Sequence, residues 1–329
     1  MKLLLAVLAV SPLSFAALGT SVHEPLSTAA EASTAPAAPH APFEFQPEVV
    51  PAGATSLFHV DFAQFRASAL GRWFFEHRDD FELDEIDEMR DELGVDPLLE
   101  IDAISGWGLG EDEEADLGGL VLFTTSALDR VLEHWSKMDG FRSMRQDGVD
   151  LFFFEETYGY VQQLADGRRA MVAASTADMA LLGARVLRGE SPSLASVPDP
   201  VVKARPMAGS YAFFAAVDLA AARDFEPASQ VFGLAQGVQL DLGEAGSSFF
   251  ARLSVPTGSL DDARDVSDVL QGIIALGSLL AGEDVPAELR DMLRALRVNS
   301  RGNLVTVDFE VPVETVGAFM RSLEDGEDF

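Results

Sequence analysis

The chain has 329 residues, a formal net charge of -31 and no cysteine. The lack of cysteine excludes disulfides, thiolate catalysis and Cys-ligated zinc, and the excess of carboxylates argues against binding to nucleic acid or to anionic lipid headgroups. Hydrophobic residues make up 48% of the chain, which is typical of a globular protein, and the length favours two domains or two halves.

Residues 1–19 have the pattern of a secretory signal peptide. Lys2 precedes an apolar run from Leu3 to Val10 that extends to Leu18 and ends among small residues. The run is short for a membrane span. We therefore expect an exported protein, periplasmic or secreted, with no stable membrane span after signal removal; an uncleaved anchor is the alternative. Residues 20–50 are rich in Ala, Ser, Thr and Pro, which predicts a flexible segment.

Residues 51–190 form the first predicted half, in which short β-type runs alternate with amphipathic helical patterns. The expected strands are Ser56–Asp61, Ile101–Leu109, Gly119–Thr124, Arg142–Arg145, Asp150–Glu155 and Arg169–Ala174, with a turn at Asp147-Gly148. The expected helices are Phe62–Arg78, Asp84–Leu93, Ser126–Met138 and Ser175–Leu187. Gly94 is a plausible C-cap of the acidic second helix.

Residues 191–205 are rich in Pro and Ser and are read as a linker to a second half, residues 206–323. The run from Val217 to Arg223 echoes the run from Val60 to Arg66, which favours a degenerate repeat. Beyond a strand after Gly209 and a short helix over Val231–Gln236, the expected elements are a hairpin (Val238–Leu242 and Ser247–Val255), a long helix (Leu260–Ala281), a second strand pair (Arg297–Asn299 and Asn303–Pro312) and a helix (Glu314–Leu323). Residues 324–329 are an acidic tail that should fray.

The order of elements predicts an α+β fold. Most strands are joined by hairpins, which make antiparallel pairs and leave the helices to pack on one sheet face. We therefore expect two related halves, each a mostly antiparallel sheet with helices packed on one face.

The chain resembles a family of exported bacterial proteins known only as a domain of unknown function, over about residues 48–224. The similarity lies in the Pro51 opening with Val60-Asp61, the Gly94-Val95-Asp96 helix end, the strand from Gly118 to Phe123, the strand from Ala170 to Ala174, and Ser193-Leu194. The resemblance implies an extracytoplasmic location and no known chemistry, so it assigns no site residue.

The sequence shows no pattern typical of a catalytic or metal site. Nucleophilic catalysis needs a nucleophile beside a base, and no Gly-x-Ser-x-Gly elbow occurs. His59 falls in a predicted strand, His77 and His134 in helices, and His23 and His40 in the flexible segment. No two histidines have metal-ligand spacing. We accordingly predict no catalytic, cofactor-binding or metal-binding residue and no cofactor.

Two local patterns have a structural and a functional interpretation. The five carboxylates in Glu111–Asp116 are candidate calcium ligands, but the loop lacks the EF-hand pattern and is read first as a solvated hairpin tip. Gly106–Gly110 looks like a phosphate loop but lacks the following Lys-Ser/Thr, and it is read as a strand.

The helix Val266–Ala281 is apolar over much of its circumference. Packing on the sheet is the first interpretation, and covering an apolar ligand or a partner surface is the second. The chain is therefore predicted to be a non-catalytic extracytoplasmic binding or scaffolding protein whose partner is an unknown protein or apolar ligand. The alternatives are a hydrolase with a dispersed carboxylate site and a carrier of an apolar ligand held between sheet and helix.

Overall fold

The computed structural model describes residues 43–81, 83, 86–87, 90–91, 94–110, 118–125, 127–198, 201–217, 233–280 and 287–324. The strands are β1 (Ser56–Asp61), β2 (Ile101–Gly108), β3 (Gly118–Thr124), β4 (Arg142–Gln146), β5 (Val149–Phe154), β6 (Thr157–Gln163), β7 (Arg169–Ala174), β8 (Ser210–Ala216), β9 (Val238–Ala245), β10 (Ser248–Pro256), β11 (Arg297–Arg301) and β12 (Leu304–Pro312). The helices are α2 (Phe62–Ala67), α3 (Ala69–Glu76), α5 (Pro97–Glu100), α6 (Ala127–Trp135), α7 (Ala177–Leu187), α9 (Leu260–Leu280), α10 (Ala287–Ala295) and α11 (Val313–Glu324), with 3-10 turns η2 (Pro47–Val49), η3 (Arg78–Asp80) and η4 (Leu194–Ser196).

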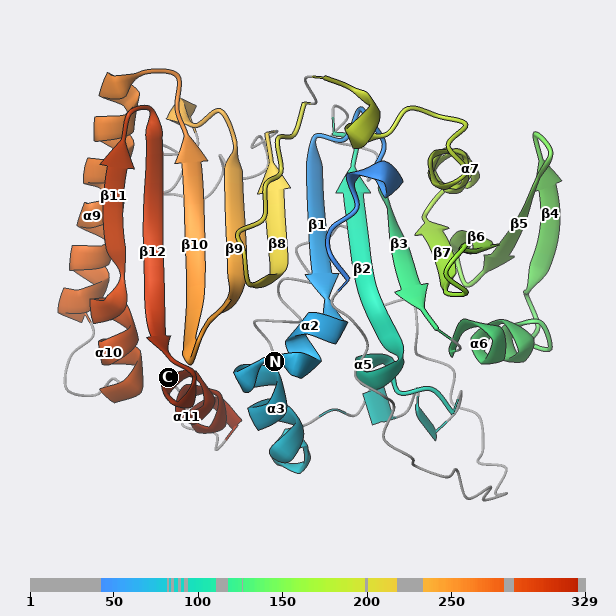
Figure 1. Cartoon of the computed structure of the whole chain (residues 1–329), viewed down its shortest axis with the longest axis horizontal. Helices are drawn as coiled ribbons and strands as arrows, with labels where there is room; N and C mark the ends of the chain where they lie inside the picture. Colours follow the sequence, from blue (N-terminus) through green and yellow to red (C-terminus); the bar gives the residue numbers. More distant parts are fainter. Residues whose placement is uncertain are drawn as a thin grey trace.

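All twelve of these strands belong to one antiparallel sheet, in the order β11-β12-β10-β9-β8-β1-β2-β3-β7-β6-β5-β4 (Figure 1). The predicted α+β class is confirmed. The two halves do not have separate sheets, however, because β1 of the first half pairs with β8 of the second, with Phe58 opposite Phe214.

The two halves share a topology. Each begins with a central strand, continues outward through a hairpin (β2-β3 or β9-β10) and a helix (α6 or α9), returns through a strand pair (β6-β7 or β11-β12), and ends in a helix (α7 or α11). The β4-β5 hairpin is additional in the first half. The last helices of the two halves lie on opposite sides of the sheet, because α7 packs beside Ala174 and α11 beside Phe249, so the duplication stays a prediction.

Most of the helices pack on one side of the sheet, which we call the helix face. Its largest core cluster joins Phe58 and Val60 of β1 to Phe65 of α2 and Phe74 of α3, and extends to Val316 of α11 in the second half. The strict alternation along β1 sends Leu57 and His59 to the opposite side, as the two-residue period of a strand requires.

That opposite side, which we call the strap face, is covered in the first half by residues 43–50 (the strap), by η4 and by α7. Phe43, Val49 and Val50 are buried, as are Leu194 and Val202. The expected boundaries are therefore wrong at these places. The fold begins before Pro51, and part of the expected linker belongs to the core, because apolar side chains in both segments pack on β1 and β8.

In the second half the strap face is polar. Arg252 of β10 pairs with Asp308 of β12, which also accepts hydrogen bonds from Asn299 and Thr306. The same strands send Phe249 and Phe309 to the helix face. An antiparallel sheet with one solvated side has this alternation of apolar and polar positions.

Contacts outside the sheet also join the halves. The Glu244 carboxylate of β9 accepts hydrogen bonds from the backbone amides of Ala69 and Leu70 at the start of α3, at 2.7 and 2.6 Å. A carboxylate at a helix N-terminus satisfies unpaired amides and the helix dipole. On the neighbouring α11, Gly317 lies so close to Trp73 that an added Cβ would be 2.5 Å from the indole.

The expected helix over Phe62–Arg78 is broken at Ser68, whose side chain accepts the Gly71 amide and caps α3. The β6 strand, the helices α5 and α10 and the 3-10 turns are not among the expected elements, whereas the other described elements match their predicted ranges to within a few residues. Residues 1–42, most of Asp84–Leu93, residues 218–232 and the tail beyond Glu324 lie outside the described part of the chain.

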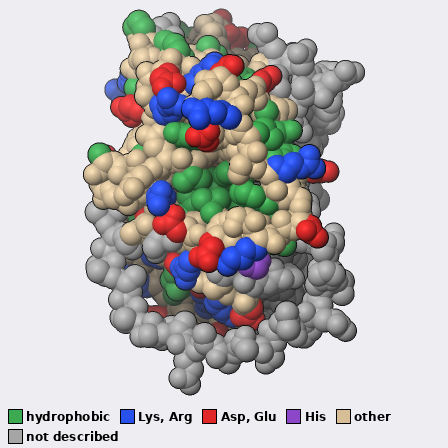
Figure 2. All heavy atoms as spheres, turned by 90° about the vertical axis from the view of Figure 1, so that its right-hand side faces the viewer, with side chains coloured by type: hydrophobic (Ala, Val, Ile, Leu, Met, Phe, Trp, Pro, Cys, Tyr) green, Lys and Arg blue, Asp and Glu red, His purple; other side chains and the backbone are tan. Residues whose placement is uncertain are grey.

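The β4 end of the sheet is shown in Figure 2. Hydrophobic side chains gather at the middle of this face, and acidic and basic side chains surround them. In the strands at this end of the sheet, Met144 of β4 and Tyr158 and Tyr160 of β6 are partly buried against the cluster that anchors α7.

Candidate functional site

His59 lies at the centre of a buried polar group on the strap face. The β1-β2 register places it opposite Ser105. Its Nδ1 is 2.8 Å from the Ser105 hydroxyl oxygen, and its Nε2 is 3.1 Å from the Phe43 carbonyl oxygen. The carbonyl can only accept, so Nε2 carries the proton and Ser105 donates to Nδ1. Burial lowers the pKa of His59 to about 4, although the bond to the Phe43 carbonyl opposes that shift.

Asp61 binds the backbone amide of the same strap residue, Phe43, whose carbonyl contacts His59. One carboxylate oxygen accepts the Phe43 amide at 2.7 Å, and the other accepts the Gln64 amide at 2.7 Å as the N-cap of α2. Burial raises the pKa of Asp61, opposed by these hydrogen bonds. Both backbone polar groups of Phe43 are therefore held by β1 side chains.

A serine beside a histidine is the arrangement expected of a nucleophile and its base. Here Ser105 is fully buried and His59 is 3% exposed, and each imidazole nitrogen has a partner. The Phe43 ring closes the group by packing on Phe123, with centroids 4.4 Å apart, beneath the Arg168 guanidinium. The group holds the strap to the sheet and is closed to a substrate.

The other candidate residues are not brought together. The Nδ1 of His77 bonds to the Trp73 carbonyl at the end of α3, and His134 lies on α6. Gly106 lies within β2, as predicted, where the Phe58 ring covers it. His23, His40 and the Glu111–Asp116 loop lie outside the described residues. Within the described ranges, no cluster of three or more His, Asp or Glu side chains could hold a metal ion.

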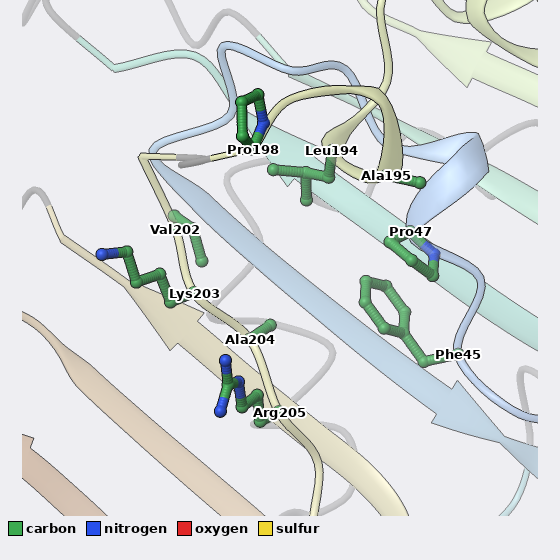
Figure 3. A pocket seen from close by; sticks show the side chains of 9 residues that line it. All are labelled: Phe45, Pro47, Leu194, Ala195, Pro198, Val202, Lys203, Ala204 and Arg205. Carbon is green, nitrogen blue, oxygen red and sulfur yellow. The ribbon is translucent and has the colours of Figure 1, made fainter.

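A hollow of about 310 Å³ lies on the strap face between the strap and the segment that leads into β8. Figure 3 shows Phe45 and Pro47 on one side and Val202 and Ala204 on the other, with Leu194 above them. Lys203 and Arg205 are its two basic lining residues. The hollow is open and mostly apolar, and it has room for a side chain of another molecule.

The second half of α9 presents an apolar surface that the sequence pattern did not distinguish from core. Ala263 and Val266 are buried against Val255 of β10 and Val305 of β12, so the first half of α9 packs as predicted. Beyond Ser267, no residue of α9 whose side chain is described is buried.

The exposed apolar residues of this part of the helix are Ile273 (38% exposed), Leu276 (55%) and Leu279 (79%). Gly272 and Gly277 have open space around the position of a Cβ. No charged residue occurs from Val269 to Leu280. We call Gly272, Ile273, Leu276 and Leu279 the α9 ridge.

The described part of the chain has no helix that is both long and apolar enough to cross a bilayer. No known protein-family model matches the chain. A search of curated proteins likewise returned no match.

Among solved structures, the chain is similar to crystal forms of TP0453. Crystal form III is 13% identical with a TM-score of 0.43, and the match covers 85% of this chain and 99% of that one. Crystal form I is 12% identical with a TM-score of 0.40, covering 85% and 98%.

Proposed function

We propose that the chain is a non-catalytic, exported protein that binds or scaffolds a partner through the α9 ridge. The observation that carries this proposal is the exposure of Leu276 and Leu279 on a helix segment without charge, in a chain with a net charge of -31. Exposed apolar residues grouped on one element, rather than scattered singly, are typical of interaction sites.

The packing between sheet and helices supports a scaffold over a carrier. The space where an apolar ligand would be held is occupied by aromatic rings. Phe65 contacts Tyr211 with centroids 5.3 Å apart, and Phe74 contacts Phe81 at the same separation. A rigid, filled interior suits a protein that presents a surface.

The buried carboxylates support a structural role over hydrolysis. Asp241 on the strap face accepts hydrogen bonds from the Met207 amide, the Ser210 hydroxyl and the Gln239 amide group, as Asp61 accepts two amides near the strap. A carboxylate engaged in this way fixes a loop and has little freedom to act as an acid or base.

Export rests on the signal-peptide pattern of residues 1–19, and the resemblance to exported proteins of unknown function is part of the same proposal. Fractionation of the native cells with mass spectrometry of the mature N-terminus tests it. A chain recovered from the cytoplasm with Met1 intact would contradict export.

The binding function is tested with a photo-crosslinking amino acid at position 276 in the native cells. We expect a discrete crosslinked species from this position. The matched control is position 99, an exposed leucine on α5 (45% exposed), which should give none. Equal labelling from both positions, or from neither, would contradict the proposed site, and hydrolysis of a model ester or glycoside by the purified chain would contradict a non-catalytic role.

A further inference from the structure

The outward side of α9 changes in character along the helix. Residues separated by three or four positions lie on one side of a helix, and one exposed line runs through Asp261, Asp265, Asp268, Gly272, Leu276 and Leu279. All acidic residues of the described helix fall in its first half. The line is therefore acidic at the start and apolar at the end.

We infer that the occupant of the α9 ridge is a second copy of this chain, bound with the two α9 helices antiparallel and a twofold axis near Leu276. This inference rests on the proposed function of the ridge and names its partner. A twofold interface must be self-complementary, and three features of the ridge meet that requirement.

The first feature is the spacing between a large side chain, Leu279, and a position without a side chain, Gly272. In an antiparallel pair whose twofold axis lies between Ala275 and Leu276, Leu279 of one copy faces Gly272 of the other. Leu279 projects into solvent, and the Gly272 position has open space and no Cβ. A leucine knob can therefore enter the gap left by a glycine, which also lets the helix axes approach closely.

The second feature is the placement of charge. A parallel pair would set Asp261, Asp265 and Asp268 of the two copies beside one another. An antiparallel pair that overlaps over the ridge directs the acidic halves of the two helices away from each other. Like charges across a contact are unfavourable, so the aspartates of the described helix disfavour the parallel arrangement.

The third feature is the apolar flank. Ile273 lies beside the line of Leu276 and Leu279 and is 38% exposed, so each helix offers a strip wider than one row of side chains. A single-helix contact is nevertheless smaller than the ~800 Å² per partner of a stable interface. We expect a weak dimer that salt strengthens, because screening reduces the repulsion between two strongly acidic copies.

Sedimentation equilibrium of the purified full-length chain in sodium chloride over a series of protein concentrations tests the inference. The expected result is a monomer–dimer equilibrium whose association constant rises with salt. Leu279→Asp should reduce that constant by about a hundredfold, since the twofold dimer loses two buried leucines and each is worth about tenfold or more. Leu260→Asp is the matched control, at an exposed leucine of the same helix (60%) outside the ridge, and it should leave the constant unchanged.

A second variant separates dimerisation from folding. A leucine at position 272 would have open space in the monomer and would replace a poor helix former, so Gly272→Leu should raise the monomer's melting temperature. The same side chain would block entry of the partner's Leu279 and weaken association. A chain that stays monomeric at the highest concentration and salt, or an association that Leu279→Asp and Gly272→Leu both leave intact, would overturn the inference. The photo-crosslink at position 276 separates the two proposals: a crosslink to another protein with a monomeric purified chain retains the proposed function and rejects the dimer.

Discussion

Replacing His59 should alter how the stability of the protein depends on pH. His59 is neutral in the fold, where burial lowers its pKa to about 4 from 6.5. Between these two values the unfolded chain binds a proton at this residue and the folded chain does not, so the free energy of unfolding falls as pH falls. At ~1.4 kcal/mol per pH unit, His59 removes about 2 kcal/mol by pH 5 and about 3 kcal/mol by pH 4.

Urea unfolding at pH 7, 6 and 5, followed by tryptophan fluorescence, measures this effect in the wild type and in His59→Gln. The glutamine amide can still donate toward the Phe43 carbonyl. The variant should therefore be less stable at pH 7 by ~1–2 kcal/mol, the value of a buried hydrogen bond, and should approach or pass the wild type at pH 5.

Asp61 acts in the opposite direction, because burial raises its pKa and a proton then stabilises the fold as pH falls through that raised value. Asp61 is present in both proteins, so the difference between them isolates His59. His134→Gln on α6 controls for the loss of any histidine. Parallel stability curves for wild type and His59→Gln, or an NMR titration of folded His59 with a midpoint near 6.5, would refute the reasoning.

Three further predictions concern the turn after β5, the cap on α3 and the overall charge. Glu155 and Glu156 both have positive φ, at 46° and 64°, which strains the backbone of residues other than glycine and asparagine. Replacing them by Asn-Gly should raise the free energy of unfolding by ~1–2 kcal/mol in chemical denaturation. An unchanged free energy of unfolding would contradict the presence of backbone strain in this turn. Glu244→Ala removes the acceptor of two α3 amides and should lower the free energy of unfolding by ~2 kcal/mol. Glu310→Ala, at an exposed glutamate, is the control. An equal loss of stability in both variants would argue against the role of Glu244 as a cap. Sodium chloride should raise the melting temperature because it screens the net charge of -31, and a flat response would contradict this. A larger shift with calcium at matched ionic strength would instead indicate a specific site.

The sequence predicted the strands and helices where local signals were strong. The β1 range was predicted correctly because a Pro-Gly turn precedes Ser56 and Asp61 caps the next helix. The β6 strand was missed because its hairpin turn consists of Glu155 and Glu156 in left-handed conformation, where turn rules look for Asn or Gly.

The strap shows why composition misled at the N-terminal boundary. The Ala/Pro/Ser/Thr bias extends toward Pro39, and Phe43 was assigned to the same flexible segment. The contacts that fix Phe43 come from His59, Asp61 and Phe123. No local pattern in residues 43–50 predicts these contacts, because the residues that make them lie in sheet strands elsewhere in the chain.

The α9 ridge illustrates a second limit. Apolar residues occur in both halves of the helix and over much of its circumference, so the pattern alone predicts packing on the sheet without identifying an exposed side. Val255 and Val305 pack on Ala263 and Val266, whereas Leu276 and Leu279 continue the outward line of the aspartates, which faces away from the sheet. A helix that is apolar over much of its circumference does not by itself reveal which side another element covers.

The pairing of β1 with β8 has a consequence for folding. Phe58 and Phe214 meet at the centre of the sheet, although the rest of the first half lies between them in the chain. Pairing between strands so far apart is slow, because a long loop must close before any contact is gained. During synthesis the first half would carry an unpaired edge at β1, the kind of edge at which strands of other chains can add. We therefore expect the centre of the sheet to be the last part to form and the place where misassembly of an incomplete chain begins.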